Sequence, residues 1–144
     1  MKKSFETMLQ VRFGHVDPAG IVYFPRIFDY VHDVFEELFE QHVGHRYYHV
    51  LQERRFGMPL VHSDVDFEKP LRFGDRPLVR VTCFHLGRSS VGLRYRFFVD
   101  LEPRLEARMT VVATDLEQMA PVPVPDEFRR AFEALLETPD PDSP

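Results

Sequence analysis

The sequence predicts an α+β fold in which a curved antiparallel sheet of about five strands wraps round one long central helix, followed by a short C-terminal helix. Three observations support this fold class. Apolar residues recur from Arg26 to Val43 with the spacing of an amphipathic helix. Other stretches alternate apolar and polar residues, which is the period of half-buried strands. The last of these stretches follow one another through loops short enough for antiparallel hairpins.

The first strand is predicted over residues 8–13, where Leu9, Val11 and Phe13 alternate with polar side chains. The helix follows and ends at Gly44, a residue typical of helix C-termini. At 1.5 Å per residue this helix is about 27 Å long. Its apolar stripe is made of Phe24, Ile27, Phe28, Val31, Val34, Phe35, Leu38, Phe39 and Val43.

The remaining elements follow from the same patterns. A short helix between turns is expected within residues 45–58. Strands are predicted from 61 to 68 and over 77–86, 91–100 and 105–115. The proline-rich segment 121–125 cannot pair as an interior strand. The second helix is predicted over 126–137, with Phe128, Phe132, Leu135 and Leu136 facing inward. Residues 1–137 are expected to form a single domain and 138–144 a mobile tail.

An amphipathic helix must bury its stripe, and one face of the predicted sheet is the only large enough partner. Such a sheet leaves two edges and one face uncovered. Small proteins often cover such surfaces with a second copy of themselves. We therefore expect a homodimer or a dimer of dimers, which would be a homotetramer.

Composition excludes several classes of function. The chain has 144 residues with a net charge of −5, which argues against nucleic acid as a partner. No apolar run approaches the roughly 20 residues of a membrane span. The single cysteine, Cys83, and an N-terminus without a signal-peptide pattern predict a cytoplasmic protein. The cysteine itself lies within a predicted strand and is interpreted as a packed, inert thiol.

Chemistry concentrates in the stretch from Phe13 to Pro25, between the first strand and the helix. Asp17 lies on a loop bent by Pro18 and Gly20, and Pro25 suits the first turn of a helix. Free backbone N–H groups at a helix N-terminus can hold an anion or polarise a carbonyl oxygen. Asp17 could therefore be a reactive carboxylate beside these N–H groups. Alternatively, it is only a turn or capping residue.

The run Asp17-Pro-Ala-Gly-Ile-Val-Tyr-Phe-Pro25, entered from Arg12-Phe13-Gly14 and continued by a long helix, closely resembles the signature of the hotdog-fold acyl-CoA thioesterases. The likeness is greatest to the 4-hydroxybenzoyl-CoA thioesterase branch. It extends more weakly through Gly57-Met-Pro-Leu-Val61 and Pro70-Leu-Arg-Phe-Gly-Asp75. The resemblance implies a hotdog fold and a thioester hydrolase that acts on an acyl-CoA or aroyl-CoA, without a cofactor because CoA belongs to the substrate.

The resemblance also implies roles for residues. Asp17 would be the nucleophile or the general base, and the backbone amides of Tyr23 and Phe24 would receive the thioester carbonyl. Gly20 and Pro25 would contact the substrate. The CoA phosphates would meet Arg88, Ser89 and Ser90, often from a neighbouring subunit, with Lys69 and Arg72 as further candidates. His15 could either orient the carboxylate or face water.

Other readings of the sequence have less support. The histidines at 42, 45 and 49 suggest a metal site, but no cysteine or carboxylate pattern with ligand spacing accompanies them, so no metal is predicted. Ser63 lacks the Gly-x-Ser-x-Gly elbow of a hydrolase nucleophile. Phe28 and Phe97 are candidates for lining an acyl pocket. Two alternative functions are a hotdog hydratase or dehydratase and a non-catalytic module that binds acyl-CoA or acyl carrier.

Overall fold

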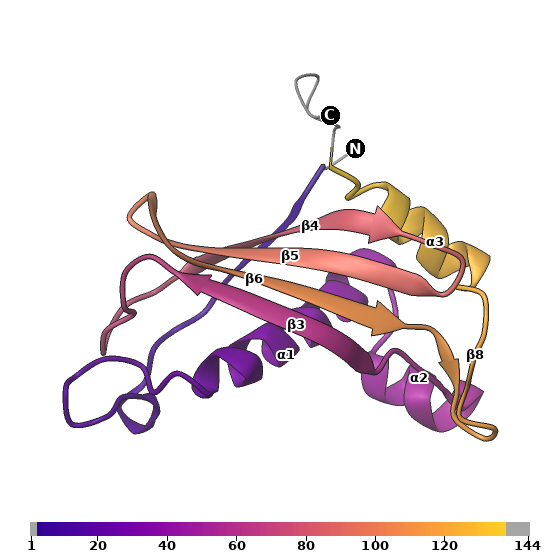
Figure 1. The fold of residues 1–144 in the computed structure, drawn as a ribbon, viewed down its shortest axis with the longest axis horizontal. Coiled ribbons are helices and arrows are strands. Elements are labelled where there is room, and N and C mark those ends of the chain that lie inside the picture. Colours follow the sequence, from indigo (N-terminus) through magenta and orange to yellow (C-terminus); the bar gives the residue numbers. More distant parts are fainter. Residues whose placement is uncertain (1–2, 138–144) are drawn as a thin grey trace.

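The computed structural model describes residues 3–137 and confirms a curved antiparallel sheet packed against one central helix, the hotdog arrangement (Figure 1). The main sheet has five strands in the order β1-β4-β5-β6-β3, so that β1 and β3 are its edges. The last three long strands form the predicted meander. The strands are β1 (Phe5–Met8), β3 (Leu60–Phe67), β4 (Leu78–Leu86), β5 (Ser90–Val99) and β6 (Glu102–Val112).

The central helix has the predicted extent. It comprises α1 (Arg26–Leu38) and a continuing π-helical turn, η2 (Phe39–Val43). Gly44 ends it with a φ of 94°, which a glycine adopts without strain, and its N–H donates to the Phe39 carbonyl. The buried residues of this helix all face the sheet: Ile27, Tyr30, Val31, Val34, Phe35, Leu38 and Phe39.

The two faces of the sheet differ as strand alternation requires. On β5 and β6 every second residue is buried against the helix. The opposite face carries charged side chains that pair with one another, for example Arg94 with Glu106 and Arg96 with Glu106. The core therefore lies between the sheet and α1, and the other face of the sheet is polar.

The predicted first strand is shifted in the structure. β1 covers residues 5–8 instead of 8–13, and its two-way pairing with β4 ends at Met8 opposite Leu78. The Leu9 N–H still donates to the carbonyl of Pro77, but Pro77 has no N–H to complete the ladder. The chain then turns through η1 (Phe13–His15), where Phe13 is 79% exposed.

The C-terminal part differs in detail from the prediction. α3 (Asp126–Glu133) is shorter than predicted, because after it the chain turns to run along β4. The backbone N–H of Cys83 donates to the Leu135 carbonyl, and Cys83 forms a parallel β-bridge with Leu136. Leu136 is consequently 43% exposed rather than buried, whereas the other three predicted core residues of this segment are buried.

The smaller elements pack at the end of the sheet near α3 (Figure 1). α2 (Tyr47–Arg54) is the short helix expected within 45–58. The predicted strand 105–115 divides into β6 and a short strand of a second sheet. That sheet has the order β2-β7-β8 and consists of β2 (Phe56–Gly57), β7 (Thr114–Asp115) and β8 (Ala120–Pro121). Pro121 therefore pairs only at an edge.

Within residues 3–137, none of the helices is long and apolar enough to cross a membrane. The predicted mobile tail, 138–144, lies outside the described residues.

Candidate active site

The loop that carries Asp17 is a tight turn closed by its own backbone. The Asp17 N–H donates to the Ile21 carbonyl at 2.9 Å, and the Gly20 N–H donates to the Asp17 carbonyl at 2.9 Å. Gly20 has a φ of 81°, a conformation that other residues adopt only with strain. The backbone conformation of the turn, and not a lack of space, therefore explains the glycine. A Cβ at this position would meet no atom within 4 Å.

The same turn is fixed to the body of the protein. Val16 and Val22 form an antiparallel bridge across its base, and Ile21 bridges to Arg72. The Val22 N–H donates to the Leu71 carbonyl at 2.8 Å, and Leu71 is buried. Asp17 is therefore presented by a short hairpin anchored on both sides.

The Asp17 carboxylate is half-buried and only partly used by the loop. Its Oδ1 accepts a hydrogen bond from the Ala19 N–H at 2.9 Å, as in an Asx turn. No donor within residues 3–137 reaches Oδ2. The carboxylate therefore keeps one oxygen free to bind a proton donor or to attack an electrophile.

The start of α1 leaves one backbone donor free. Pro25 has no N–H, and the next three N–H groups, of residues 26–28, donate to the carbonyls three residues before them. The Tyr23 N–H donates to the His15 carbonyl at 3.0 Å. The Phe24 N–H has no acceptor in the described part of the chain and is the unpaired donor at the positive end of the helix dipole.

His15 contacts Tyr30 rather than Asp17. Its Nδ1 accepts hydrogen bonds from the Arg12 N–H at 3.2 Å and from the Tyr30 hydroxyl at 2.9 Å. A nitrogen that accepts from a backbone N–H carries no proton, so the ring has its proton on Nε2. Burial raises the pKa of Tyr30 to about 12, which keeps the phenol protonated as the donor. Within residues 3–137 the His15 ring makes no hydrogen bond to the Asp17 carboxylate, and His15 is linked to the helix start through its carbonyl, which accepts from the Tyr23 N–H.

The predicted CoA-binding residues lie in the turn between β4 and β5. This turn is fixed by α3, because Arg129 donates to the carbonyls of Gly87 and Arg88 at 2.7 and 3.1 Å. The Ser90 hydroxyl lies 3.0 Å from His85 Nε2, and Ser89 accepts from the Ala113 N–H. The Arg88 side chain is exposed and makes no ion pair within residues 3–137.

Within one chain this turn and the Asp17 loop lie at opposite ends of the sheet (Figure 1). The Asp17 loop is at the N-terminal end of α1, whereas the β4–β5 turn lies beside α3. The structure therefore places Asp17, Tyr23, Phe24, Gly20 and Pro25 together but not with residues 88–90. Of the further candidates, Lys69 pairs with Glu102 at 2.8 Å, and Arg72 forms the bridge to the Asp17 loop.

The three clustered histidines have separate contacts. His42 Nε2 lies 2.7 Å from the Ala131 carbonyl, and His45 Nε2 lies 3.3 Å from Glu127 Oε2. The His49 ring lies against Tyr48, with ring centroids 6.0 Å apart. The first two contacts link the end of the central helix and the turn after it to α3, whereas the third lies within α2.

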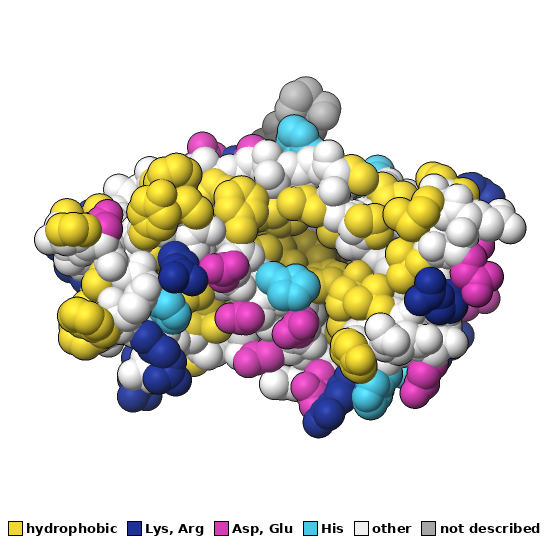
Figure 2. Space-filling view, turned by 90° about the horizontal axis from the view of Figure 1, so that it is seen from below, with side chains coloured by type: hydrophobic (Ala, Val, Ile, Leu, Met, Phe, Trp, Pro, Cys, Tyr) yellow, Lys and Arg dark blue, Asp and Glu magenta, His cyan; other side chains and the backbone are white. Residues whose placement is uncertain are grey.

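Two apolar cavities lie along the gap between α1 and the edge strand β3. The cavity nearer the Asp17 loop has a volume of about 340 Å³ and is lined by Ile21, Phe24 and Ile27 of the loop and helix, with Phe67 on β3. The second has a volume of about 310 Å³ and lies beside the other end of β3, at Leu60. Figure 2 shows this side of the molecule, with a hollow floored by hydrophobic side chains.

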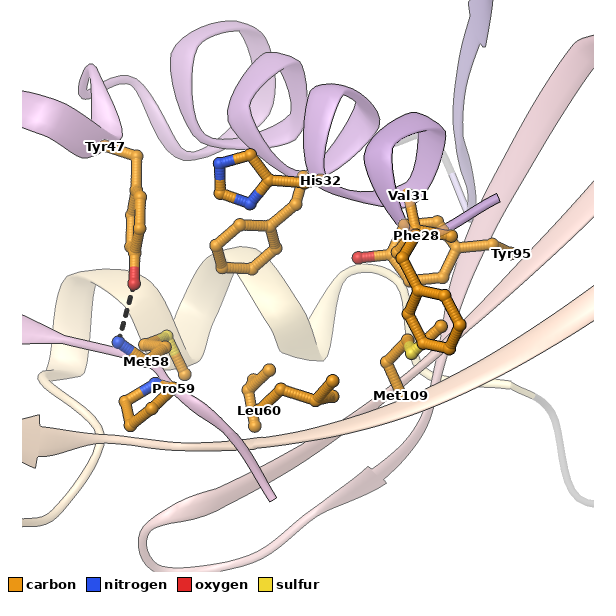
Figure 3. A pocket seen from close by; sticks show the side chains of 11 residues that line it. Phe28, Val31, His32, Tyr47, Met58, Pro59, Leu60, Tyr95 and Met109 are labelled. Atoms are coloured by element: carbon orange, nitrogen blue, oxygen red, sulfur yellow. Dashed lines mark hydrogen bonds between the residues drawn. The ribbon is translucent and has the colours of Figure 1, made fainter. Parts of the chain in front are cut away.

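The second cavity is bounded by Phe28 and His32 of α1 and by Tyr95 of β5 (Figure 3). Tyr47 reaches it from α2, and its hydroxyl accepts a hydrogen bond from the Met58 N–H at 2.7 Å. Of the two phenylalanines expected at an acyl pocket, Phe28 lines this cavity, whereas Phe97 is fully buried elsewhere in the core.

Sequence reasoning missed the tyrosines of this region. Tyr30 lies three residues after Ile27 and belongs to the buried stripe, so helical spacing could have found it. Tyr95 alternates with Leu93 and Phe97 on β5, so strand spacing could have placed it inside. No sequence signal shows that its hydroxyl faces a cavity.

Comparison with known proteins agrees with this fold. A 1,4-dihydroxy-2-naphthoyl-CoA hydrolase of Synechococcus sp. (strain WH7803) is 28% identical over 134 residues, which cover 88% of this chain and 87% of that protein. A crystal structure of a 1,4-dihydroxy-2-naphthoyl-CoA thioesterase from Synechocystis has a TM-score of 0.82 at 24% identity, covering 98% of this chain and 99% of that one. A thioesterase superfamily structure from Jannaschia sp. CCS1 has a TM-score of 0.87 at 22% identity, covering 94% of each chain.

Residues 11–132 match the sequence model of the Thioesterase-like superfamily. The matched segment begins just before the Asp17 loop and ends within α3, so it contains the central helix, the meander and both cavities. The chain belongs to the Thioesterase-like superfamily.

Proposed function

We propose that this protein hydrolyses an acyl-CoA or aroyl-CoA thioester to the free acid and CoA, with Asp17 as nucleophile or general base. One observation carries the proposal. The Asp17 carboxylate has one free oxygen, and the Phe24 N–H at the start of α1 has no acceptor within residues 3–137. These are the two groups that thioester hydrolysis requires when no metal takes part.

The Phe24 N–H would stabilise the oxygen of the thioester carbonyl as negative charge develops on it. A donor held rigidly at a helix N-terminus is already oriented, and removing one such donor in other enzymes lowers the rate by about 10²–10³. Asp17 would either attack the carbonyl carbon or take a proton from the attacking water, a contribution of about 10²–10⁴ for general-base catalysis.

Tyr23 has a different part in this proposal from Phe24. Its N–H is already bonded to the His15 carbonyl, so it could donate to the substrate only after that bond opens. In this proposal the Tyr23 N–H holds the loop against the helix. It would become a second donor to the oxyanion only if the His15 carbonyl moved away. Gly20 fixes the turn, and Pro25 leaves the helix start without a competing N–H.

The acyl group would occupy the apolar gap between α1 and β3. The proteins of similar sequence are named as hydrolases of 1,4-dihydroxy-2-naphthoyl-CoA, an aroyl thioester, which favours a flat aromatic acyl group. Phe24 and Phe28 lie one helical turn apart along this gap and provide aromatic surfaces.

Self-association would complete the site. β3 is an edge strand whose outer side is unpaired in the described structure, and three of its apolar residues, Leu60, Val61 and Phe67, are 48%, 60% and 55% exposed. If two copies pair antiparallel along β3, each Asp17 loop would lie at the end of the joined sheet at which the other copy carries its β4–β5 turn. Arg88, Ser89 and Ser90 would then bind the CoA phosphates of the neighbour's substrate, in a dimer or a dimer of dimers.

Two further expectations belong to the proposal. The reaction would need no metal or other cofactor, so that chelation with EDTA leaves the rate unchanged. The enzyme would work in the cytoplasm, where acyl-CoA esters are met and where a free cysteine such as Cys83 stays reduced.

The test is thiol release from a panel of acyl-CoA and aroyl-CoA esters by the wild type and by Asp17→Asn. We expect the wild type to release CoA and the Asn variant to lose about 10²–10⁴ of kcat, because the amide can neither attack nor accept a proton. Asp126→Asn is the matched control, since Asp126 is an exposed aspartate in the first turn of α3.

The outcomes separate the alternatives. A protein that binds CoA esters without releasing thiol would be the non-catalytic module, and hydration of enoyl-CoA without thiol release would indicate the hydratase. Unchanged hydrolysis in Asp17→Asn would remove Asp17 from the mechanism.

A further inference from the structure

Tyr95 is an exception on the inner face of β5. Along that face the alternating residues are all buried, and Tyr95 is the only one with a polar side-chain atom. The residue is 1% exposed, and its side chain makes no hydrogen bond within residues 3–137. The inward-facing residues of β5 are Val91, Leu93, Tyr95, Phe97 and Val99.

The Tyr95 hydroxyl faces the cavity beside Phe28 and Val31 (Figure 3). In the same view the Tyr47 hydroxyl is already bonded to the Met58 N–H. The two tyrosines line one cavity, but only Tyr47 has a protein partner. Tyr95 is thus an almost fully buried side chain whose hydroxyl opens into a mainly apolar cavity and bonds to no group within residues 3–137.

Packing does not explain a tyrosine at this position. A hydroxyl buried without a hydrogen bond costs free energy relative to the same ring without it. Phe97 occupies the next inward position of the same strand and is fully buried, so the core accepts a phenylalanine there. A water molecule would find few further polar partners in a cavity lined mainly by apolar side chains. The polar atom that satisfies Tyr95 is therefore expected to come from a ligand.

The position of Tyr95 relative to the helix start sets the size of that ligand. Val31, which lines the cavity with Tyr95, follows Phe24 by seven residues, or about 10 Å along the helix axis. An acyl group whose thioester carbonyl is bound at the Phe24 N–H would therefore have to extend by up to about two helical turns along the gap to reach Tyr95. A substituted aromatic acyl group spans such a distance.

We propose that the Tyr95 hydroxyl forms a hydrogen bond with a neutral polar substituent, a hydroxyl or carbonyl oxygen, on the acyl group, and so selects substituted over unsubstituted aroyl thioesters. This specificity role rests on the proposed thioesterase function. A charged substituent is disfavoured because the cavity is apolar. Burial raises the pKa of Tyr95, so the phenol stays protonated and can donate as well as accept.

The experiment compares wild type, Tyr95→Phe and the control Tyr48→Phe, which removes the hydroxyl of an exposed tyrosine on α2. The substrates are benzoyl-CoA and 2-naphthoyl-CoA and their hydroxylated derivatives, with the hydroxyl moved round the ring. For each ring system we divide the kcat/KM of the best hydroxylated ester by the kcat/KM of the unsubstituted ester. We expect Tyr95→Phe to lower this ratio by roughly tenfold. The melting temperature should change little, because Tyr95→Phe keeps the packed ring and removes only a hydroxyl that bonds to no group within residues 3–137.

The same ratio in wild type and Tyr95→Phe would overturn the proposal, as would an equal fall for both classes of ester together with a lower melting temperature. If no ester is hydrolysed, the thioesterase proposal fails by itself, and calorimetric binding of hydroxy-2-naphthoates and 2-naphthoate then decides. A preference for the hydroxylated acid in wild type that is lost in Tyr95→Phe supports the Tyr95 contact. Equal affinities, or no binding of either acid, would contradict it.

Discussion

At the scale of single residues, burial decides which reactive groups can act. Asp17 and Cys83 both carry side chains capable of nucleophilic attack, yet their surroundings differ. Asp17 is half-buried on a surface turn with one oxygen free, whereas Cys83 is fully buried and its thiol donates to the His85 carbonyl at 3.2 Å. Burial raises the pKa of Cys83 to about 11, so its thiolate is scarce at neutral pH.

We predict that native Cys83 reacts with iodoacetamide at pH 8 at least roughly a hundredfold more slowly than the unfolded chain, because the pKa shift alone reduces the thiolate by about that factor. Mass spectrometry of alkylated protein, with and without urea, measures the rates. Cys83→Ala should keep its thioester hydrolysis. Rapid labelling of the folded protein, or a folded Ala variant without activity, would show that this thiol is accessible or functional.

At the scale of elements, the segment after α3 completes the edge of the sheet beyond β1. β1 pairs with β4 only as far as Val81, and further along β4 the residue Cys83 bonds to Leu135 and Glu137 through the backbone. The Glu137 carboxylate then accepts hydrogen bonds from Arg94 at 2.6 Å and Thr82 at 2.8 Å. The C-terminal segment is thus held by the outer face of the sheet.

Burial opposes ionisation of Glu137, but the hydrogen bonds from Arg94 and Thr82 outweigh it and lower the pKa of this carboxyl below 4.5. A lowered pKa in the folded state contributes stability that is present above pH 4.5 and is lost as the pH falls through the folded value. We predict that Glu137→Gln lowers the free energy of unfolding by about 1–2 kcal/mol at pH 7.

The difference between wild type and Glu137→Gln should shrink as the pH falls below 4.5, where the wild-type carboxyl takes up its proton. Urea unfolding at pH 7 and at pH 3.5 measures it. Glu133→Gln, on an exposed position of α3, is the matched control and should have little effect at either pH. A difference that is constant with pH would exclude ionisation of Glu137 as its cause.

At the scale of the whole molecule, the two halves of the proposed site lie at opposite ends of one chain. Asp17 is at the N-terminal end of α1, and Arg88 is beside α3 (Figure 1). The edge strand β3 runs along the sheet between these two ends, and its apolar residues Leu60, Val61 and Phe67 are exposed. A two-fold axis beside β3 would join the Asp17 loop of one copy to the Arg88 turn of the other.

We predict that a mixed oligomer of Asp17→Asn and Arg88→Ala chains recovers roughly half of the wild-type activity per dimer, measured below KM. In such a dimer one site combines an intact Asp17 from one chain with an intact Arg88 from the other. Two affinity tags on co-expressed chains allow the mixed species to be purified, and the two parent homo-oligomers are the controls. Activity no greater than the mean of the parents would place Asp17 and Arg88 of one site on the same chain.

The sequence by itself determined the fold class, the central helix and the position of the loop that carries Asp17. The apolar stripe from Ile27 to Phe39 and the strand alternation are local patterns, and only one packing buries them all. Asp17, Gly20 and Pro25 form a contiguous motif whose roles depend on the adjacent turn and helix start. These features could be predicted because each depends on residues that are close together in the sequence.

Only the tertiary structure decided which groups are free. The Tyr23 N–H and the Phe24 N–H are adjacent in sequence. The His15 carbonyl of η1 accepts from the Tyr23 N–H, whereas the Phe24 N–H has no acceptor within residues 3–137. The strand expected at residues 8–13 ends early because its partner at Pro77 lacks an N–H. Tyr95 faces a cavity because α1, β3 and β5 do not fill the space between them, which is a property of packing that no local pattern records.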